Sequence, residues 1–193
     1  MTVLEDRIAM AECDDESTLD AMFDRLEPTP EGYKVEIVEG TVYMSPQRTT
    51  HWQIALSIII QLCATYPQKR LMSDVRIDYP GHRNGFATDV TALAEGAEPA
   101  ENGRWRHEDV EFVAEVVSKG TAANDYGPKK TAFATAEVPV YVIADPYKGI
   151  CYVYTQPKEG SYVTRTTVPF GEDIDLTGTV VDLVLKTDEF PRD

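Results

Sequence analysis

Strand-like runs follow one another through most of this chain, and one apolar run among them is long enough to form a helix on its own. That run, "HWQIALSIIIQLCATY" (51–66), is apolar on nearly every side, so we expect a helix packed between a sheet and a second layer. Before it, "YKVEIVEGTVYMSP" (33–46) alternates apolar and polar residues on both sides of Glu39-Gly40, which predicts a β-hairpin. A helix set among short strands favours a layered fold that contains both elements.

The rest of the chain predicts more strands, separated by Gly, Pro and Asn. The strand-like runs lie at 70–79, 87–95, 109–118, 138–146, 149–157 and 161–168, with a last short element at 179–185. The "DPYKG" turn (145–149) makes the 138–146 and 149–157 runs a hairpin, and 101–109 is a polar loop. A second helix is expected from Asp125, as its N-cap, to about Ala136. This order indicates an α+β (α/β-like) fold with helices flanking one mixed sheet.

Length and composition bound the organisation of the chain. The 193 residues suit a single domain, which we place at 31–193, after a loosely packed acidic lead-in at 1–30 with a short helix at 17–26. No apolar run reaches the ~20 residues of a membrane span, and the N-terminus lacks a secretory pattern, so no membrane partner is expected. Cys13, Cys63 and Cys151 are widely spaced, which argues against zinc and disulfides and fits a cytoplasmic location.

The formal net charge of −15 bears on the partners of the protein. An acidic surface repels a phosphate backbone, so DNA would be bound against the protein's own field. The simpler interpretation of this charge is that it keeps the protein soluble.

Two carboxylates within apolar strand-like runs carry the chemistry. Asp89 lies in "ATDVTALA" and Glu115 in "FVAEVVS", 26 residues apart, which allows their strands to be neighbours. Two ionised carboxylates at one buried place repel each other unless a cation sits between them. Mg²⁺, with Mn²⁺ as a substitute, is the hard cation that this arrangement suits, and it can activate water or polarise a phosphoryl oxygen. The alternative is that both acids face solvent on their strands.

Asp125 and Lys129 are spaced one helical turn apart, after Glu115. Lys129 could orient a water or balance the charge of a phosphate, whereas the alternative is an ordinary surface pair on a helix. "RWRHED" (104–109), which contains His107, combines basic and aromatic residues that could stack a base and bind phosphate. A surface loop explains that cluster equally well.

The motifs together resemble a known family. "YKVEIVEGTVYMSPQRTTH", "TDVTALA" and "AEVVSKGTAANDYGPKKTAFATAEVPVYVIADP" are similar to the bacterial Uma-two family of restriction-endonuclease-like proteins, once a domain of unknown function and now in the PD-(D/E)XK nuclease superfamily. The resemblance covers roughly residues 33–185 and implies a restriction endonuclease-like core. It further implies hydrolysis of DNA with Mg²⁺, and a homodimer by analogy with nucleases that pair to cut two strands.

The resemblance also implies the site residues. Asp89 and Glu115 match the metal-binding acids, Lys129 the catalytic lysine, and Glu36 an early glutamate that completes or supports the site. Secondary candidates are His51, which opens the long helix, and Ser118 and Asp125. His51 also suits a packing or capping role.

The chain departs from the family pattern at three places. Thr88 replaces the proline before the aspartate, Val142 replaces a tryptophan, and Val117 stands where the superfamily has a strand lysine. Lys129 therefore has to reach the site from the following helix. Its amino group is expected within reach of Glu115, and Lys129→Ala is expected to abolish cleavage and to spare the fold.

Three functions remain open from the sequence. The first is a Mg²⁺-dependent endonuclease, and the second is a catalytically weak or inactive binding module of the same fold. A metal-dependent hydrolase of a small phosphorylated molecule is the third. A positive rim around Asp89 and Glu115 would favour the nuclease over the binding module.

Overall fold

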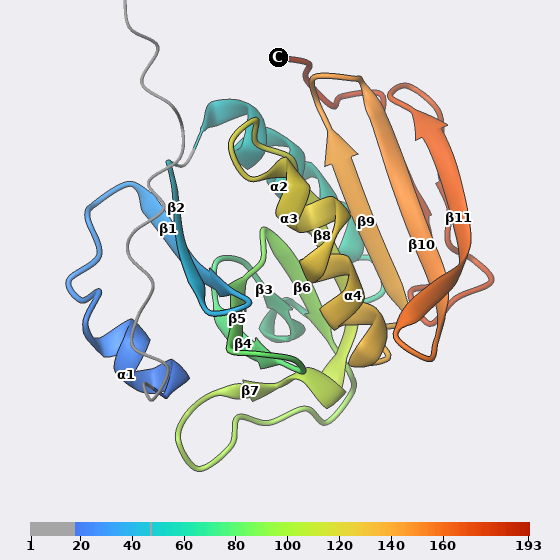
Figure 1. Ribbon diagram of the computed structural model, residues 1–193. Coiled ribbons are helices and arrows are strands. Elements are labelled where there is room, and N and C mark those ends of the chain that lie inside the picture. The colour runs from blue at the N-terminus through green and yellow to red at the C-terminus, as the bar shows by residue number, and fades with distance from the viewer. Residues whose placement is uncertain (1–17, 47) are drawn as a thin grey trace, which may run out of the picture.

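The computed structural model describes residues 18–46 and 48–193, and Cys13 and the start of the acidic lead-in lie outside these ranges (Figure 1). The helices are α1 (Leu19–Asp24), α2 (Thr49–Leu62), α3 (Ala122–Tyr126) and α4 (Pro128–Thr135). The strands are β1 (Tyr33–Val38), β2 (Thr41–Pro46), β3 (Leu71–Met72), β4 (Arg76–Tyr79), β5 (Asn84–Ala87), β6 (Val90–Leu93), β7 (Trp105–Arg106), β8 (Val110–Val116), β9 (Val140–Asp145), β10 (Ile150–Lys158), β11 (Ser161–Pro169), β12 (Ile174–Asp175) and β13 (Val184–Leu185).

The predicted hairpin is present as β1 and β2. The two strands pair antiparallel up to Val38 and Thr41, and both turn residues have positive φ, 48° at Glu39 and 78° at Gly40. Positive φ at both positions is the signature of the two-residue turn whose twist matches a hairpin. β1 continues into a five-stranded sheet of order β2-β1-β5-β4-β7.

A second, six-stranded sheet has the order β11-β10-β9-β8-β6-β3. Within it β8 and β9 run parallel, and the other neighbouring pairs are antiparallel. The β9–β10 hairpin forms as expected, because the Asp145 carboxylate accepts hydrogen bonds from the backbone N–H groups of Tyr147 and Lys148, both at 3.1 Å. Every residue of β9 is buried, which suits a central strand covered on both faces.

Helices cover both faces of the six-stranded sheet (Figure 1). On one face, Ile54 and Ile58 of α2 pack against Phe112 and Ala114 of β8. On the other face, α4 packs Phe133 against the alternate residues of β8, including Val113. The two-residue period of the strand explains this division into two core layers.

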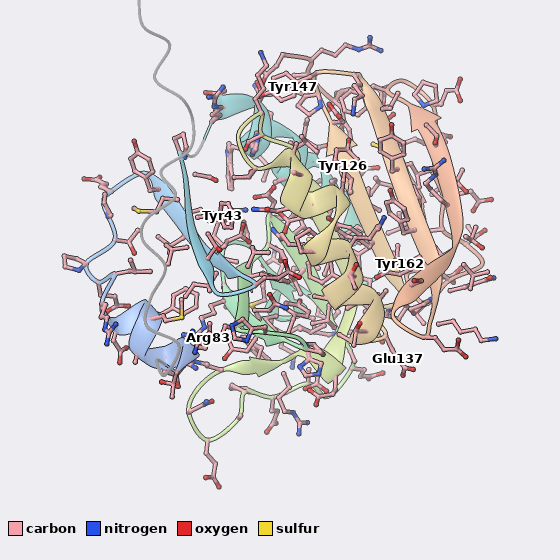
Figure 2. All side chains as sticks on the ribbon, viewed as in Figure 1. Tyr43, Arg83, Tyr126, Glu137, Tyr147 and Tyr162 are labelled. Atoms are coloured by element: carbon pink, nitrogen blue, oxygen red, sulfur yellow. The ribbon has the colours of Figure 1, made fainter. Side chains whose placement is uncertain are left out.

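Hydrogen bonds from tyrosine hydroxyls connect the α3–α4 layer to the strands. Figure 2 shows two of these tyrosines, Tyr126 and Tyr162, on the side of the sheet that α3 and α4 cover. Tyr126 donates a hydrogen bond of 2.6 Å to Asp145, and Tyr162 donates one of 2.9 Å to the carbonyl of Val138. Tyr141 of β9 donates to the carbonyl of Asp125 at 3.1 Å. The hydrogen bond from Tyr141 therefore attaches the segment that carries Asp125 and Lys129 to β9.

Five expectations from the sequence need correction. The chain forms two main mixed sheets rather than one, and Thr88–Asp89, between β5 and β6, is one of the places where it changes sheet. Asp125 is not an N-cap: it lies inside α3, and α4 begins separately after Gly127. The polar loop contains β7, which pairs with β4.

The fourth and fifth corrections concern the helices α2 and α1. α2 buries one face only, and its other side leaves Trp52 56% and Ile60 62% exposed, so no second layer covers it among the described residues. α1 is packed rather than loosely attached, because Met22 is 1% exposed and contacts the cluster formed by Ile37 and Val42. None of the described helices is long and apolar enough to cross a membrane.

Candidate active site

The site lies where the two sheets meet. One cleft, with an open volume of about 700 Å³, is lined by all seven residues that the sequence singled out: Glu36, His51, Asp89, Glu115, Ser118, Asp125 and Lys129. They come from β1, α2, the β5–β6 bend, β8, the segment after β8, α3 and α4.

Asp89 and Glu115 lie side by side, as expected, although Asp89 is on a bend rather than within a strand. The bend directly precedes β6, whose Val90 pairs with Ala114 of β8, so the register brings residue 89 next to residue 115. Glu115 Oε2 accepts a hydrogen bond of 3.3 Å from the backbone N–H of Asp89. Asp89 Oδ2 in turn accepts one of 2.7 Å from the backbone N–H of Val116. These reciprocal bonds fix both carboxylates at the same end of the sheet.

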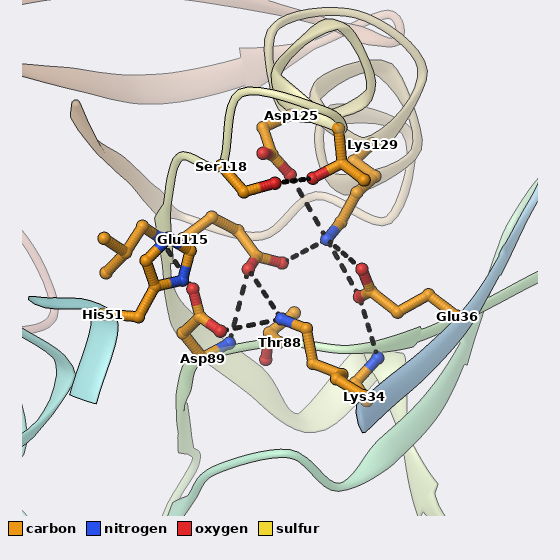
Figure 3. A network of polar contacts seen from close by, with 12 residues as sticks. Lys34, Glu36, His51, Thr88, Asp89, Glu115, Ser118, Asp125 and Lys129 are labelled. Carbon is orange, nitrogen blue, oxygen red and sulfur yellow. Dashed lines mark hydrogen bonds and ion pairs between the residues drawn. The ribbon is translucent and has the colours of Figure 1, made fainter. Parts of the chain in front are cut away.

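Lys129 reaches the site from the second residue of α4 (Figure 3). Its ammonium lies 2.5 Å from Glu115 Oε1, 2.9 Å from Glu36 Oε1 and 3.3 Å from Asp125 Oδ1. The side chain is only 1% exposed, so the pair with Asp125 is no surface pair. The structure therefore places the amino group beside Glu115, where the sequence predicted it.

Glu36 links Lys129 to the bend that carries Asp89. Glu36 Oε1 accepts a hydrogen bond of 3.1 Å from the backbone N–H of Ala87, and both of its carboxylate oxygens lie within 3.1 Å of the Lys129 ammonium. Because Ala87 is the last residue of β5, Glu36 ties β1, β5 and α4 together.

Burial sets the protonation of the acids. Burial raises the pKa of Glu115 well above its ordinary value, and the nearby Asp89 and Glu36 carboxylates add to this against the opposing effect of Lys129 and Lys34. Burial likewise raises the pKa of Asp125 to about 6, although Lys129 opposes the shift. Burial alone would raise the pKa of Asp89 as well, but the ammonium of Lys34 holds it below its ordinary value.

Two of the secondary candidates, His51 and Ser118, have partners close to them in the cleft. His51 is in the first turn of α2, and its Nε2 lies 3.1 Å from the carbonyl oxygen of Val117. Burial is the main effect on this imidazole and lowers its pKa. The hydroxyl of Ser118 lies 2.6 Å from that of Thr121, so both line the cleft as a bonded pair. These contacts give His51 and Ser118 fixed orientations toward the cleft.

The residues of the cleft that sequence reasoning missed include Lys34, Arg48 and Trp52. Lys34 carried a usable signal, since it lies two positions before Glu36 and alternate residues of a strand face the same side. Its ammonium lies 2.7 Å from Asp89 Oδ1 and 3.6 Å from Glu115 Oε2. Trp52 and Arg48 flank the start of α2 and carry no motif that would mark them in advance.

The "RWRHED" cluster does not contribute to the site. None of Arg104, Trp105, Arg106 and His107 lines the cleft. Arg104 instead pairs with Asp20 of α1 and with Asp78 of β4, and His107 Nδ1 lies 3.1 Å from the carbonyl oxygen of Asp78. The cluster connects β7 and the following turn to α1 and β4, so its role in this structure is to hold elements together.

The donor set fits a hard divalent cation. In the described part of the chain no three His, Cys, Asp or Glu side chains converge as a complete metal site. Mg²⁺ needs only one or two carboxylates because it keeps several waters, and Asp89 with Glu115 supplies two. Four carboxylates (Glu36, Asp89, Glu115 and Asp125) face two ammonium groups (Lys34 and Lys129), so full ionisation leaves an excess of two negative charges. A divalent cation would neutralise this excess.

Comparisons with known proteins bear on the family and the fold of this chain. A family model described as "Uma2: Putative restriction endonuclease" matches residues 20–188. A crystal structure of a putative nuclease belonging to DUF820 from Anabaena variabilis ATCC 29413 superposes with a TM-score of 0.68 at 14% identity, and the match covers 90% of this chain and 97% of that one. No curated protein matches the chain. The structural likeness confirms the mixed α+β, restriction endonuclease-like fold, and the family match over most of the sequence shows that this chain belongs to the Uma2 family.

Proposed function

We propose that this protein is a Mg²⁺-dependent endonuclease that hydrolyses phosphodiester bonds of DNA. The observation that carries the proposal is the convergence of Asp89, Glu115 and Lys129 in one cleft, with the ammonium 2.5 Å from Glu115. The family description and the relation to a nuclease structure support the same class of reaction.

Each residue has a distinct role in this proposal. Asp89 and Glu115 would hold the cation, which supplies charge to polarise the phosphoryl oxygen and acidify a water. Lys129 would place a positive charge next to Glu115, where it can orient the attacking water and stabilise charge that develops on the phosphate. Glu36 and Asp125 would act as positioning residues, because both contact the Lys129 ammonium and fix where it points.

A binding module with little or no cleavage activity is the second candidate, and the charge of the cleft favours it. Acidic residues in the lining are Glu36, Asp74, Asp89, Glu115 and Asp125, whereas the basic ones are Lys34, Arg48 and Lys129. Lys34 and Lys129 are paired with these acids, and acidic residues outnumber basic ones in the lining, so the lining residues form no positive rim. A bound divalent cation would remove the excess negative charge, which makes metal dependence the deciding test.

Nicking of supercoiled plasmid DNA in Mg²⁺ or Mn²⁺, with EDTA as the blank, tests the proposal. We expect metal-dependent nicking by the parent and a loss of at least about 100-fold in Asp89→Asn and Glu115→Gln, which keep side-chain size and remove a ligand charge. Asp173→Asn, at an exposed carboxylate far from the cleft residues in sequence, is the matched control and should cut like the parent.

Two outcomes would contradict the endonuclease. Equal nicking by the parent and both site variants would place the activity elsewhere or in a contaminant. A parent that binds Mn²⁺ but leaves plasmid, linear duplex and single-stranded DNA intact would identify the binding module instead. Sedimentation of the same samples would test the homodimer.

A further inference from the structure

Lys34 places its ammonium beside both Asp89 and Glu115, the two carboxylates that would hold the cation. The side chain of Lys34 leaves β1 on the same face as Glu36 and ends between the two carboxylates (Figure 3). Its Nζ lies 2.7 Å from Asp89 Oδ1, with a hydrogen bond, and 3.6 Å from Glu115 Oε2.

The two lysines of the site differ in how tightly they are held. The Lys129 side chain is 1% exposed and contacts Glu36, Glu115 and Asp125, so three carboxylates from three elements fix its ammonium. The Lys34 side chain is 11% exposed and pairs with Asp89 and Glu115 only. Lys34 also lies next to Tyr33, which is 42% exposed, near the open end of the hairpin. A four-methylene stem at such a place can turn its ammonium toward water without any change in the strand.

An ammonium and a divalent cation cannot both stay against the same oxygens. The like charges repel, and the oxygen lone pairs that accept from Lys34 are those that a cation would use. We propose that Lys34 is a built-in competitor of the divalent cation: it neutralises Asp89 and Glu115 in the metal-free protein and has to leave them when the cation binds. This inference rests on the cation site of the proposed function, and it assigns to Lys34 the control of metal affinity.

If Lys34 competes with the cation, its removal should change metal affinity in the opposite direction from the removal of a residue that supports the site. A residue that merely supports the site should weaken metal binding when it is changed. Removal of a competitor should strengthen it. Lys34→Gln keeps a hydrogen-bond donor for Asp89 and removes the charge, whereas Lys34→Arg keeps the charge, so the two variants separate charge from hydrogen bonding.

Titration calorimetry with Mn²⁺ on the full chain tests this. We expect Lys34→Gln to bind Mn²⁺ at least tenfold more tightly than the parent, and Lys34→Arg to stay within about threefold of it. Lys186→Gln, which removes an exposed lysine paired with Asp173, is the control and should equal the parent. In the double variant Lys34→Gln/Asp89→Asn the gain should disappear, which locates it at this pair of acids.

The outcomes separate this inference from the proposed function. A parent that binds Mn²⁺ together with a Lys34→Gln that binds it no more tightly would overturn the competition and leave the cation site standing. If Lys34→Gln binds Mn²⁺ and the parent does not, the competition would be supported, because Lys34 would then exclude the cation completely from the parent. Absence in both proteins would overturn the cation site and the competition with it.

A folding readout keeps the test decisive if Lys34→Gln is unstable without metal. Circular dichroism of thermal unfolding should show a larger Mn²⁺-induced rise in the midpoint for Lys34→Gln than for the parent, because binding stabilises the folded state in proportion to affinity. An equal or smaller rise would overturn the competition.

Discussion

At the scale of single residues, the site is a network of buried charges that hold one another in place. Lys129 is buried with three carboxylates, and breaking a buried ion pair by removing one partner costs about 3–5 kcal/mol because the remaining charge is left unpaired. We therefore expect Lys129→Ala to destabilise the fold as well as to affect cleavage. Glu115→Gln and Asp89→Asn also remove one partner of a buried ion pair, but they keep the side-chain shape and leave Lys129 paired with Glu36 and Asp125, so they disturb the packing less.

Whether a site residue could be predicted from the sequence depends on how far its partners lie from it along the chain. The spacing of Asp125 and Lys129 indicated contact, and the acids within apolar runs indicated burial, so Asp89, Glu115 and Lys129 were found from local pattern together with the family resemblance. Lys34 was missed because its partner Asp89 is 55 residues away, on the bend that leads into the other sheet. Local pattern does not specify which strands of two sheets will face each other.

The raised pKa of Asp125, about 6, predicts a pH dependence of stability. A carboxyl whose pKa is raised on folding holds its proton longer in the folded state, so its contribution to stability falls as pH rises from the unfolded pKa near 3.8 through the folded value near 6. We expect the free energy of unfolding of the parent to fall by about 2 kcal/mol relative to Asp125→Asn between pH 4.5 and 7.5.

Urea unfolding of the parent and Asp125→Asn across this range measures the effect. Asp24→Asn, at an exposed carboxylate of α1, is the control and should track the parent. A difference between the parent and Asp125→Asn that does not change with pH would show that Asp125 titrates normally in the folded protein.

At the scale of elements, the sequence predicted whether a segment is a helix or a strand better than it predicted the residues at which the segment begins and ends. The hairpin at 33–46, the long helix and the strands of the six-stranded sheet were predicted because their periodicities are strong and local. The helix expected from Asp125 to Ala136 is broken at Gly127, because the α3–α4 connection is decided by packing against β9, where Tyr141 bonds to the carbonyl of Asp125. β7 was read as loop because its two residues pair only with the distant β4.

Gly127 is the element-scale position on which the site depends. A Cβ at residue 127 would lie 2.9 Å from the backbone oxygen of Ala123, which cannot move aside as a side chain can. We expect Gly127→Ala to lower the free energy of unfolding by about 1–3 kcal/mol, because the α3–α4 connection that aims Lys129 has to shift. Urea unfolding at a fixed pH measures this.

Gly178→Ala is the matched control. A Cβ at residue 178 meets no atom within 4 Å, and this substitution should change stability by no more than about 0.5 kcal/mol. Equal stabilities for the two variants would mean that the connection relaxes without cost and that Gly127 does not set the position of α4.

At the scale of the whole molecule, two sheets meet at one cleft, and one of the places where the chain passes between them is Asp89. Glu36 and Lys34 come from the five-stranded sheet, and Glu115 comes from the six-stranded sheet. The site is therefore complete only when both sheets are docked. This docking is the part of the fold that the sequence did not predict, because pairing between distant strands depends on the packing of the entire chain.

The net charge of −15 and the paired lysines of the cleft predict weak, shallowly salt-dependent binding to DNA. Affinity for duplex DNA falls with salt with a slope of about 0.9 for each phosphate that a protein neutralises. The cleft offers at most three cationic groups, Lys34, Arg48 and Lys129, so we expect a loss of no more than about 40-fold between 50 and 200 mM NaCl, measured by fluorescence anisotropy of a labelled duplex in EDTA. A protein with six to ten phosphate contacts would lose about 10³–10⁵ over that range. A loss of that size would show that DNA binds to a basic surface outside this cleft, and it would separate the DNA interface from the carboxylates proposed to cut it.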